Sequence, residues 1–281
     1  MLPDTAPDPD LVTFEQMMAL EAHGADTFVG IGPRYPWGGL YGGQIVAQSL
    51  RAAGLTVDPG YHPHSLHAYF IRPGDASEPI RFEVDRIRNG RSFTTRRVVA
   101  RQSIGAIFNL AASFHVPEDA VDVQPLAIAP GIGPADSYTS NTWSHVFDRR
   151  HVDHDGGRPT RAAARAWLRM TEPVADDVLT QACALAYLSD DLPTEAVVAD
   201  HPIKTSMTDE GDFDRTFMSA SLDHAIWFHR PIDAGQWHLH DLRSRGLTRS
   251  RGLATGEIYA EDGTHAATIS QEVLLRVRRN D

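Results

Sequence analysis

The sequence predicts an α+β fold in which two helix-wrapped antiparallel sheets join into one. The first observation is an internal repeat, because residues 70–73 read F-I-R-P and residues 228–231 read F-H-R-P, 158 positions later. The same separation relates Gly105 to Gly263, and an arginine-rich segment and a final strand-like stretch accompany each glycine. The second observation is a helical pattern ahead of each copy. One helix packed on an antiparallel sheet buries the apolar stripe of the helix together with one face of the sheet.

Each predicted helix has its apolar residues on one face. In the first half they follow Gly42-Gly43 and are Ile45, Val46, Ser49, Leu50 and Ala53. In the second half they follow residues 173–177 and are Leu179, Ala182, Cys183, Ala186 and Tyr187. The repeat therefore predicts an N-terminal unit over 10–117, a linker over 118–160 that is rich in proline and glycine, and a C-terminal unit over 161–281.

Composition fits a globular chain. It has 281 residues, 42% of them hydrophobic, and a formal net charge of −11. That charge argues against general binding to nucleic acid or to an anionic membrane surface. The acidic, proline-rich N-terminus lacks the features of a signal peptide, and no apolar run approaches a membrane span, so we expect a cytoplasmic protein without stable membrane insertion. The single cysteine, Cys183, falls on an apolar helical stripe, which favours a packing role.

Three loops do not predict ligand sites. Residues 151–155 contain His151, Asp153, His154 and Asp155, but no matching distant ligand is evident, so we expect no metal. The acidic segment 208–214 lacks the spacing of a calcium loop. The glycine-rich segment 38–44 has no G-K-[ST] ending and no G-x-G-x-x-G pattern, so it does not predict a nucleotide-binding loop.

Arginines cluster at corresponding places in the two copies. They are Arg86, Arg88, Arg91, Arg96 and Arg97 in the first, and Arg243, Arg245, Arg249 and Arg251 in the second. One interpretation is that they protect the exposed edges of strands. The other is that their planar guanidinium groups bind phosphates, which would let an acidic protein take an anionic ligand.

Polar residues set the second half apart. Residues 269–277 alternate so that Gln271 falls on the apolar, inward face with Ile269, Val273, Leu275 and Val277, whereas the shift of 158 makes its first-half counterpart Ser113. The second helix also runs into Asp190 and Asp191, where the helix dipole disfavours carboxylates by about 0.3 to 1 kcal/mol each. The sequence favours a site kept in one repeat only. The alternative is that both aspartates are solvated residues at a fraying helix end.

Long motifs extend over nearly the whole chain. They are Gly42-Gly43-Gln44, H-S-L-H-A-Y-F-I-R-P-G-D at 64–75, L-D-H-A-I-W-F-H-R-P at 222–231, G-E-I-Y at 256–259 and Gln271-Glu272. These motifs resemble those of the acyl-CoA thioesterase II (TesB-like) family, whose members are tandem, or double, hotdog folds. The resemblance implies a catalytic aspartate at Asp190, a catalytic hydroxyl at Ser221, where the family usually has threonine, and a catalytic amide at Gln271.

The resemblance also implies the reaction, the hydrolysis of a fatty acyl-CoA to free fatty acid and CoA. Asp190 would accept a proton from water while Ser221 and Gln271 orient it. Backbone N–H groups of Gly42, Gly43 and Gln44 would bind the developing oxyanion. No cofactor is implied.

Arg97 and Arg251 represent the two clusters that would meet the CoA phosphates. The joined sheets would leave free edges, so we also expect a homo-oligomer.

Two alternatives stay open at this point. A hotdog hydratase acting on enoyl-CoA would need closely spaced Asp and His on its helix, and neither predicted helix carries that pair. A non-catalytic module that binds acyl-CoA would keep the fold without the reaction.

Overall fold

A computed structural model describes residues 12–152, 154–155, 158–159, 163–203 and 212–278. Its helices are α1 Phe14–Met18, α2 Gly42–Gly54, the short 3-10 helix η1 Ala135–Ser137, α3 Val178–Leu188, α4 Pro193–Ala199 and α5 Asp212–Thr216. The strands of the first half are β1 Glu21–Ala22, β2 Thr27–Gly30, β3 His62–Phe70, β4 Ile80–Asn89, β5 Phe93–Gln102 and β6 Gly105–His115. Those that follow are β7 Phe147–His151, β8 His154–Asp155, β9 Arg158–Pro159, β10 Ala163–Met170, β11 Phe217–Ser221, β12 Asp223–Phe228, β13 His238–Thr248, β14 Arg251–Ala260 and β15 His265–Val277.

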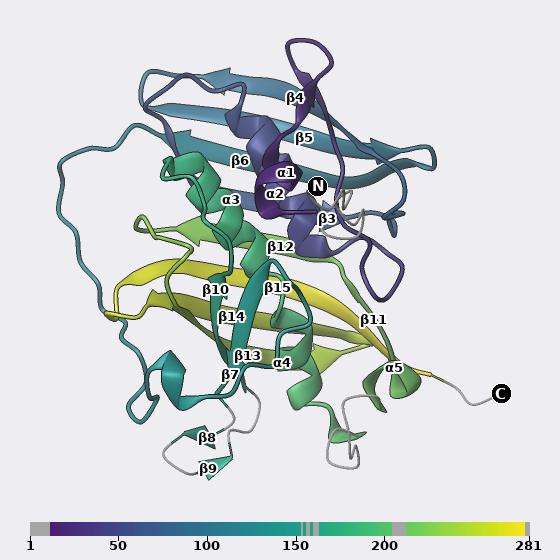
Figure 1. The fold of residues 1–281 in the computed structure, drawn as a ribbon, viewed down its shortest axis with the longest axis vertical. Helices are drawn as coiled ribbons and strands as arrows, with labels where there is room; N and C mark the ends of the chain where they lie inside the picture. Colours follow the sequence, from purple (N-terminus) through teal and green to yellow (C-terminus); the bar gives the residue numbers. More distant parts are fainter. Residues whose placement is uncertain (1–11, 153, 156–157, 160–162, 204–211, 279–281) are drawn as a thin grey trace, which may run out of the picture.

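One antiparallel sheet runs through both halves of the molecule (Figure 1). Its strand order is β1-β2-β4-β5-β6-β3-β12-β15-β14-β13-β10-β7, with β11 pairing with β15. The halves join where β3 pairs with β12, and Leu66 stands opposite Ile226 there. Both side chains are fully buried, so the core continues across the junction. This arrangement confirms the predicted α+β tandem hotdog.

The helices α2 and α3 lie against each other in opposite directions. Gly42, at the start of α2, lies beside Asp190, just after α3, and Gly54, at the end of α2, lies beside Leu179, near the start of α3. The carboxylate of Asp177 caps α3 by accepting a hydrogen bond from the backbone N–H of Thr180 at 2.9 Å. The predicted apolar residues of both helices are buried apart from the half-buried Leu179, but most of the other residues of these helices are buried as well. The antiparallel pair therefore brings the beginning of each helix to the end of the other.

The second half contains an extra segment between its helix and its strands. The starts of α2 and α3 differ by 136 positions, whereas Phe70 and Phe228 at the ends of β3 and β12 differ by 158. The extra residues include α4, which begins at Pro193 and packs on β10, β13, β14 and β15. Proline is suited to the first position of a helix, where its missing N–H has no partner to lose. The chain turns between α3 and α4, and Asp190 lies in that turn.

The segment treated as a linker contains a strand of the sheet. Within 118–160, β7 pairs with β10, and Trp167 stands opposite Arg150. Residues 116–134, where proline and glycine predict a linker, contain no helix or strand, but the composition carries no information about the strand that follows. The domain limits of 10–117 and 161–281 stay a prediction. Neither predicted unit includes β7.

The last strand corrects the assignment of Ser113 as the counterpart of Gln271. Ala100 and Ile258 are related by 158 positions, but their partners Phe108 and Ala267 are related by 159. The connection between β14 and β15 is therefore one residue longer, and the counterpart of Gln271 is Ala112. The predicted inward face holds from Ile269 to Leu275. It fails at Val277, the last residue of β15, which is 46% exposed and lies past Leu274, where the pairing with the start of β14 stops.

Other predictions concern single residues. Cys183 is fully buried in α3, and burial raises the pKa of its thiol, as a packing role requires. His151 contacts Glu195 at 3.3 Å, whereas Asp153 lies outside the described residues, as do 204–211 of the acidic segment. In the described part of the chain, no His, Cys, Asp and Glu side chains group in threes that suit a metal ion. No helix among these residues combines the length and apolarity needed to cross a membrane.

Candidate active site

The structure brings the three predicted catalytic side chains together. Asp190 lies in the turn after α3, Ser221 ends β11, and Gln271 lies on β15. The Ser221 hydroxyl donates to Asp190 Oδ1 at 3.3 Å, and Gln271 Nε2 donates to Ser221 Oγ at 2.8 Å. Gln271 is fully buried and Asp190 is 8% exposed. The three side chains therefore form one connected polar group in an apolar surrounding.

The first half contributes the start of α2 to this group. The backbone N–H of Gly43 donates to the Asp190 carboxylate. A Cβ at Gly42 would lie 2.3 Å from Asp190 Oδ2, and one at Gly43 would lie 2.2 Å from the carbonyl oxygen of Tyr187. Glycine at both positions lets the helix start approach the acid this closely. Asp190 thus lies near the positive end of the α2 dipole, although it follows the negative end of α3.

Burial decides the protonation of Asp190. Loss of water raises the pKa of its carboxyl to about 7, while hydrogen bonds from Gln271, Ser221 and Gly43 oppose that rise. The negative charge of Asp191 adds to it. A carboxyl with this pKa can take and return a proton near neutral pH, which is what a general base requires.

His224 fixes the orientation of Gln271. Its Nδ1 contacts Gln271 Oε1, and its Nε2 lies 2.8 Å from Ser189 Oγ. Burial lowers the pKa of the His224 imidazole to about 4, so the ring is neutral. Because an amide oxygen only accepts, Nδ1 carries the proton, and the Gln271 NH₂ must point toward Ser221. This role was not predicted from the sequence, although the alternation of β12 places His224 on the inward face with Ile226.

Asp223, next to His224, has a different position. Its Oδ1 accepts the backbone N–H of Glu272 at 2.6 Å, and Asp223 is partly exposed. This contact ties β12 to β15 and leaves Asp223 outside the polar group of Asp190.

Asp191 is held by a buried ion pair. Arg149 of β7 lies 3.1 Å from Asp191 Oδ2, and Trp143 Nε1 donates to Asp191 Oδ1 at 2.7 Å. The Asp191 side chain is only 2% exposed. The alternative that Asp190 and Asp191 are solvated residues at a fraying helix end is therefore wrong. Sequence did not indicate this pair, because Arg149 and Trp143 lie in the segment taken as a linker.

Aromatic rings cover the region beside these aspartates. Trp143 lies edge-on to Tyr41, with ring centroids 5.1 Å apart, and Tyr35 stacks on Trp37 at 5.1 Å. The Tyr41 hydroxyl donates to the carbonyl oxygen of Tyr187 at 2.9 Å, near the end of α3. Trp37 is 52% exposed, so the cluster extends from the buried aspartates to the surface.

The predicted substrate-binding side chains lie apart from one another. The amide of Gln44 is buried, where it accepts from Tyr35 and donates to Gln48. Only the backbone of Gln44 is left for the predicted role. Arg97 pairs with Asp85 at 3.0 Å, and the structure places Arg251 beside Glu272 at 2.8 Å.

Arg97 and Arg251 both lie exposed, on strands of different halves, and contact with phosphate stays a prediction for each. Arg96, by contrast, is 2% exposed, and its guanidinium donates to Thr56 and Asn89, which is a structural role.

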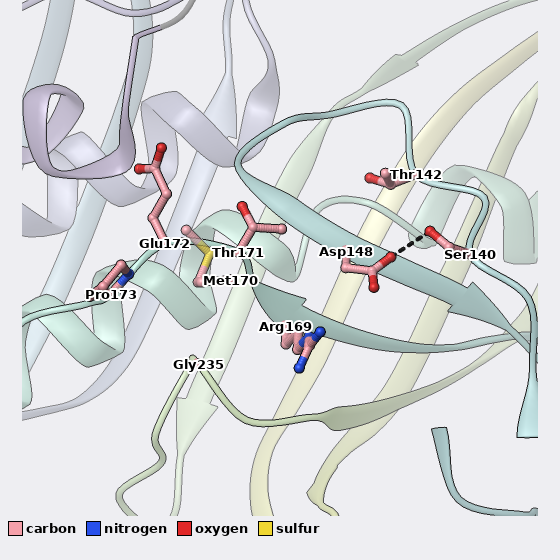
Figure 2. Close-up of a pocket in the computed structure, with 9 residues that line it drawn as sticks. All are labelled: Ser140, Thr142, Asp148, Arg169, Met170, Thr171, Glu172, Pro173 and Gly235. Carbon is pink, nitrogen blue, oxygen red and sulfur yellow. Dashed lines mark hydrogen bonds between the residues drawn. The ribbon is translucent and has the colours of Figure 1, made fainter. Parts of the chain in front are cut away.

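A separate polar recess of about 550 Å³ lies where β7 and β10 meet the chain before α3 (Figure 2). The Ser140 hydroxyl donates to Asp148 Oδ1 at 2.6 Å, and the Arg169 guanidinium lies 4.4 Å from the centre of the Trp237 ring. Glu172, also on the wall, accepts the backbone N–H of Phe14. The recess contains none of the Asp190, Ser221 and Gln271 side chains, and its two acids, Asp148 and Glu172, outnumber Arg169.

Comparisons with known proteins agree with this fold. Family models described as the acyl-CoA thioesterase N-terminal and C-terminal domains match residues 32–115 and 117–275. Acyl-CoA thioesterase 2 of Haemophilus influenzae is 32% identical over 261 residues, covering 84% of this chain and 87% of that protein. Acyl-coenzyme A thioesterase 8 of Mus musculus is also 32% identical, over 85% of this chain and 81% of that protein.

A solved structure of an acyl-CoA thioesterase has the same fold. The acyl-CoA thioesterase II TesB2 from Mycobacterium marinum superposes with a TM-score of 0.82 at 34% identity, covering 95% of this chain and 98% of that one. Two joined hotdog units with these relatives define a thioester hydrolase. More particularly, the chain belongs to the acyl-CoA thioesterase II family.

Proposed function

We propose that this thioester hydrolase cleaves fatty acyl-CoA into free fatty acid and CoA by direct attack of water held by Asp190, Ser221 and Gln271. The observation that supports the proposal is the connected group of these three side chains at the start of α2. Each has the chemistry for its part, because a carboxylate accepts a proton, while a hydroxyl and an amide fix a water by hydrogen bonds.

The reaction then runs in two steps. Water oxygen bonds to the thioester carbonyl carbon while its proton passes to Asp190, and the carbonyl oxygen becomes an oxyanion. The oxyanion collapses, the carbon–sulfur bond breaks, and the CoA thiolate takes the proton back from Asp190. No covalent enzyme intermediate forms, so Ser221 orients water and does not attack.

The start of α2 is suited to the oxyanion. The first N–H groups of a helix have no partner within the helix and lie at its positive end. Gly43 uses its N–H for Asp190, which leaves the neighbouring backbone donors of Gly42 and Gln44 as the proposed oxyanion site.

The decisive experiment measures release of free thiol from a long-chain acyl-CoA by the wild-type protein and by Asp190→Asn. Hydrolysis by the first and little by the second is the expected result. Hydration of an enoyl-CoA without thiol release would favour the hydratase. Tight binding of acyl-CoA with no turnover by the wild-type protein would favour the non-catalytic binding module.

The pH profile gives a second prediction. Because Asp190 must be ionised to accept a proton and its pKa is raised to about 7, kcat/KM should rise about tenfold per pH unit below pH 7 and level off above it. The sign follows from the base being active when deprotonated. A profile that is flat between pH 5 and 8, measured with stability monitored at each pH, would contradict the assignment.

The arginines give a third prediction. Changing Arg97 or Arg251 to Ala should raise KM for acyl-CoA more than it lowers kcat, since phosphate contacts stabilise the bound substrate and the transition state alike. The effect should shrink with added salt, and an acyl-pantetheine that lacks those phosphates should not respond. Equal losses on both substrates would assign these arginines to the fold.

A cytoplasmic location and association into a homo-oligomer also stay predictions. Sedimentation at micromolar concentration tests the second, and a monomer there would count against it.

A further inference from the structure

A second cavity lies at the opposite end of α3 from Asp190. Its volume is about 370 Å³, and Val178, Ala182 and Leu185 of α3 form one wall with Phe228 and Ile232. Its lining along α3 runs from Val178 to Leu185, and none of Asp190, Ser221 and Gln271 lines it. The cavity is therefore distinct from the proposed reaction site.

The duplication relates this cavity to the proposed reaction site. Phe228 corresponds to Phe70, and the start of α3 corresponds to the start of α2. Phe70 lies at the start of α2, since its ring would be 3.1 Å from a Cβ at Gly42. Phe228 likewise lines the cavity with Val178, the first residue of α3. The proposed reaction site and the cavity are therefore formed by corresponding elements of the two halves.

The reactive side chains are missing at the second place. Asp190 follows the start of α3 by 12 positions, and the residue 12 positions after the start of α2 is Gly54. The counterparts of Ser221 and Gln271 are Pro63 and Ala112, because Pro63 pairs with Phe114 as Ser221 pairs with Val273.

Leu179 occupies the space where an acid would lie, 2.4 Å from a Cβ placed on Gly54. Glycine, proline and alanine supply neither a base nor a side-chain donor, so nothing at these positions can activate water.

The lining of the cavity indicates its ligand. The wall along α3 is aliphatic except for Gln181, whereas the other side carries His62, His64, His115, His229 and Arg230. Asp176 is the one acid that lines this cavity within the described residues. An apolar wall with a few convergent polar groups, at a volume of a few hundred cubic ångströms, is typical of small-molecule sites. An aliphatic chain fits the wall, and the imidazoles together with Arg230, which already pairs with Asp122, can donate hydrogen bonds to an anionic head group.

We propose that this cavity is a second, non-catalytic binding site for a linear alkyl chain with an anionic head. Fatty acid and acyl thioester share this chemistry. The chain lies along Val178, Ala182 and Leu185, and the head lies among the histidines. His64 is already oriented there, because its Nε2 lies 2.8 Å from Ser113 Oγ. The site does not depend on the proposed role of Asp190.

The test measures equilibrium binding of decanoate to the full chain by calorimetry. Ala182→Phe places a ring in the cavity and should weaken this binding by about tenfold or more, which is about 1.4 kcal/mol, while kcat/KM for acyl-CoA stays within about twofold. Val178 is half-buried on the rim of the cavity, and Val178→Trp should weaken decanoate binding in the same way. This second variant tests the proposal if Ala182→Phe does not fold.

Gly42→Ala is the matched control at the other end of the helices. It should reduce hydrolysis and leave decanoate binding to the cavity intact. Decyl-CoA, a thioether that cannot be hydrolysed, separates the two sources, since its binding should respond to Ala182→Phe only if acyl thioesters also use the cavity. Absence of decanoate binding to the wild-type protein, or its loss in Gly42→Ala but not in Ala182→Phe, would overturn the proposal.

Discussion

Replacing Asp190 by Asn should lower kcat for acyl-CoA hydrolysis by about 10² or more while the fold stays intact. Asparagine keeps the shape of the side chain but cannot accept the proton of the attacking water. Because burial raises the pKa of Asp190 from 3.8 to about 7, the carboxyl is ionised at pH 8 and its buried charge destabilises the folded protein relative to the unfolded chain, so the variant should melt no lower there. Gln271→Ala should cause a loss of similar size, since it removes the donor to Ser221.

Asp223→Asn is the matched control for that experiment. Asp223 begins β12 close to Ser221, but its Oδ1 accepts a backbone N–H, and an asparagine oxygen can keep that hydrogen bond. Turnover should therefore stay near the wild-type value. A loss as large as that of Asp190→Asn, without unfolding, would move the base away from Asp190.

Replacing Arg149 by Met should lower the free energy of unfolding by about 3 to 5 kcal/mol. The change leaves the Asp191 carboxylate buried with Trp143 as its remaining partner, and an unpaired buried charge is costly. Urea denaturation measures the loss. The double variant Arg149→Met with Asp191→Asn should recover much of it, because neither charge is then left alone.

Arg97→Met provides the comparison for this prediction. Arg97 and Asp85 are 59% and 53% exposed, and exposed pairs contribute roughly 0 to 1 kcal/mol. The loss for Arg97→Met should therefore be several times smaller than that for Arg149→Met. Equal losses would show that burial of the Arg149–Asp191 pair has no energetic consequence.

Periodic and repeated features of the sequence predicted the fold class. The helical spacing in α2 and α3, the repeated R-P segments and the alternation of β15 as far as Leu275 all report local conformation, and the structure agrees with each. Resemblance to the family then selected Asp190, Ser221 and Gln271, which the structure brings into one hydrogen-bonded group.

Features that depend on distant contacts could not be predicted in this way. Trp143 reaches Asp191 across 48 positions, and His224 reaches Gln271 across 47, so no local pattern records either contact. The extra residue before β15 shifts the repeat by one position, and a constant shift therefore selected Ser113 in place of Ala112. Strand β7 escaped notice because its short charged sequence resembles a loop.

The antiparallel pairing of α2 and α3 also bears on how many inhibitor molecules each chain should bind. Two identical units placed this way would present two equal junctions between a helix start and a helix end, and each substitution would alter both at once. Because both units lie in one polypeptide, Gly54 and Asp190 could change independently. A tight inhibitor that mimics the tetrahedral intermediate should accordingly titrate one equivalent per chain, however many chains assemble.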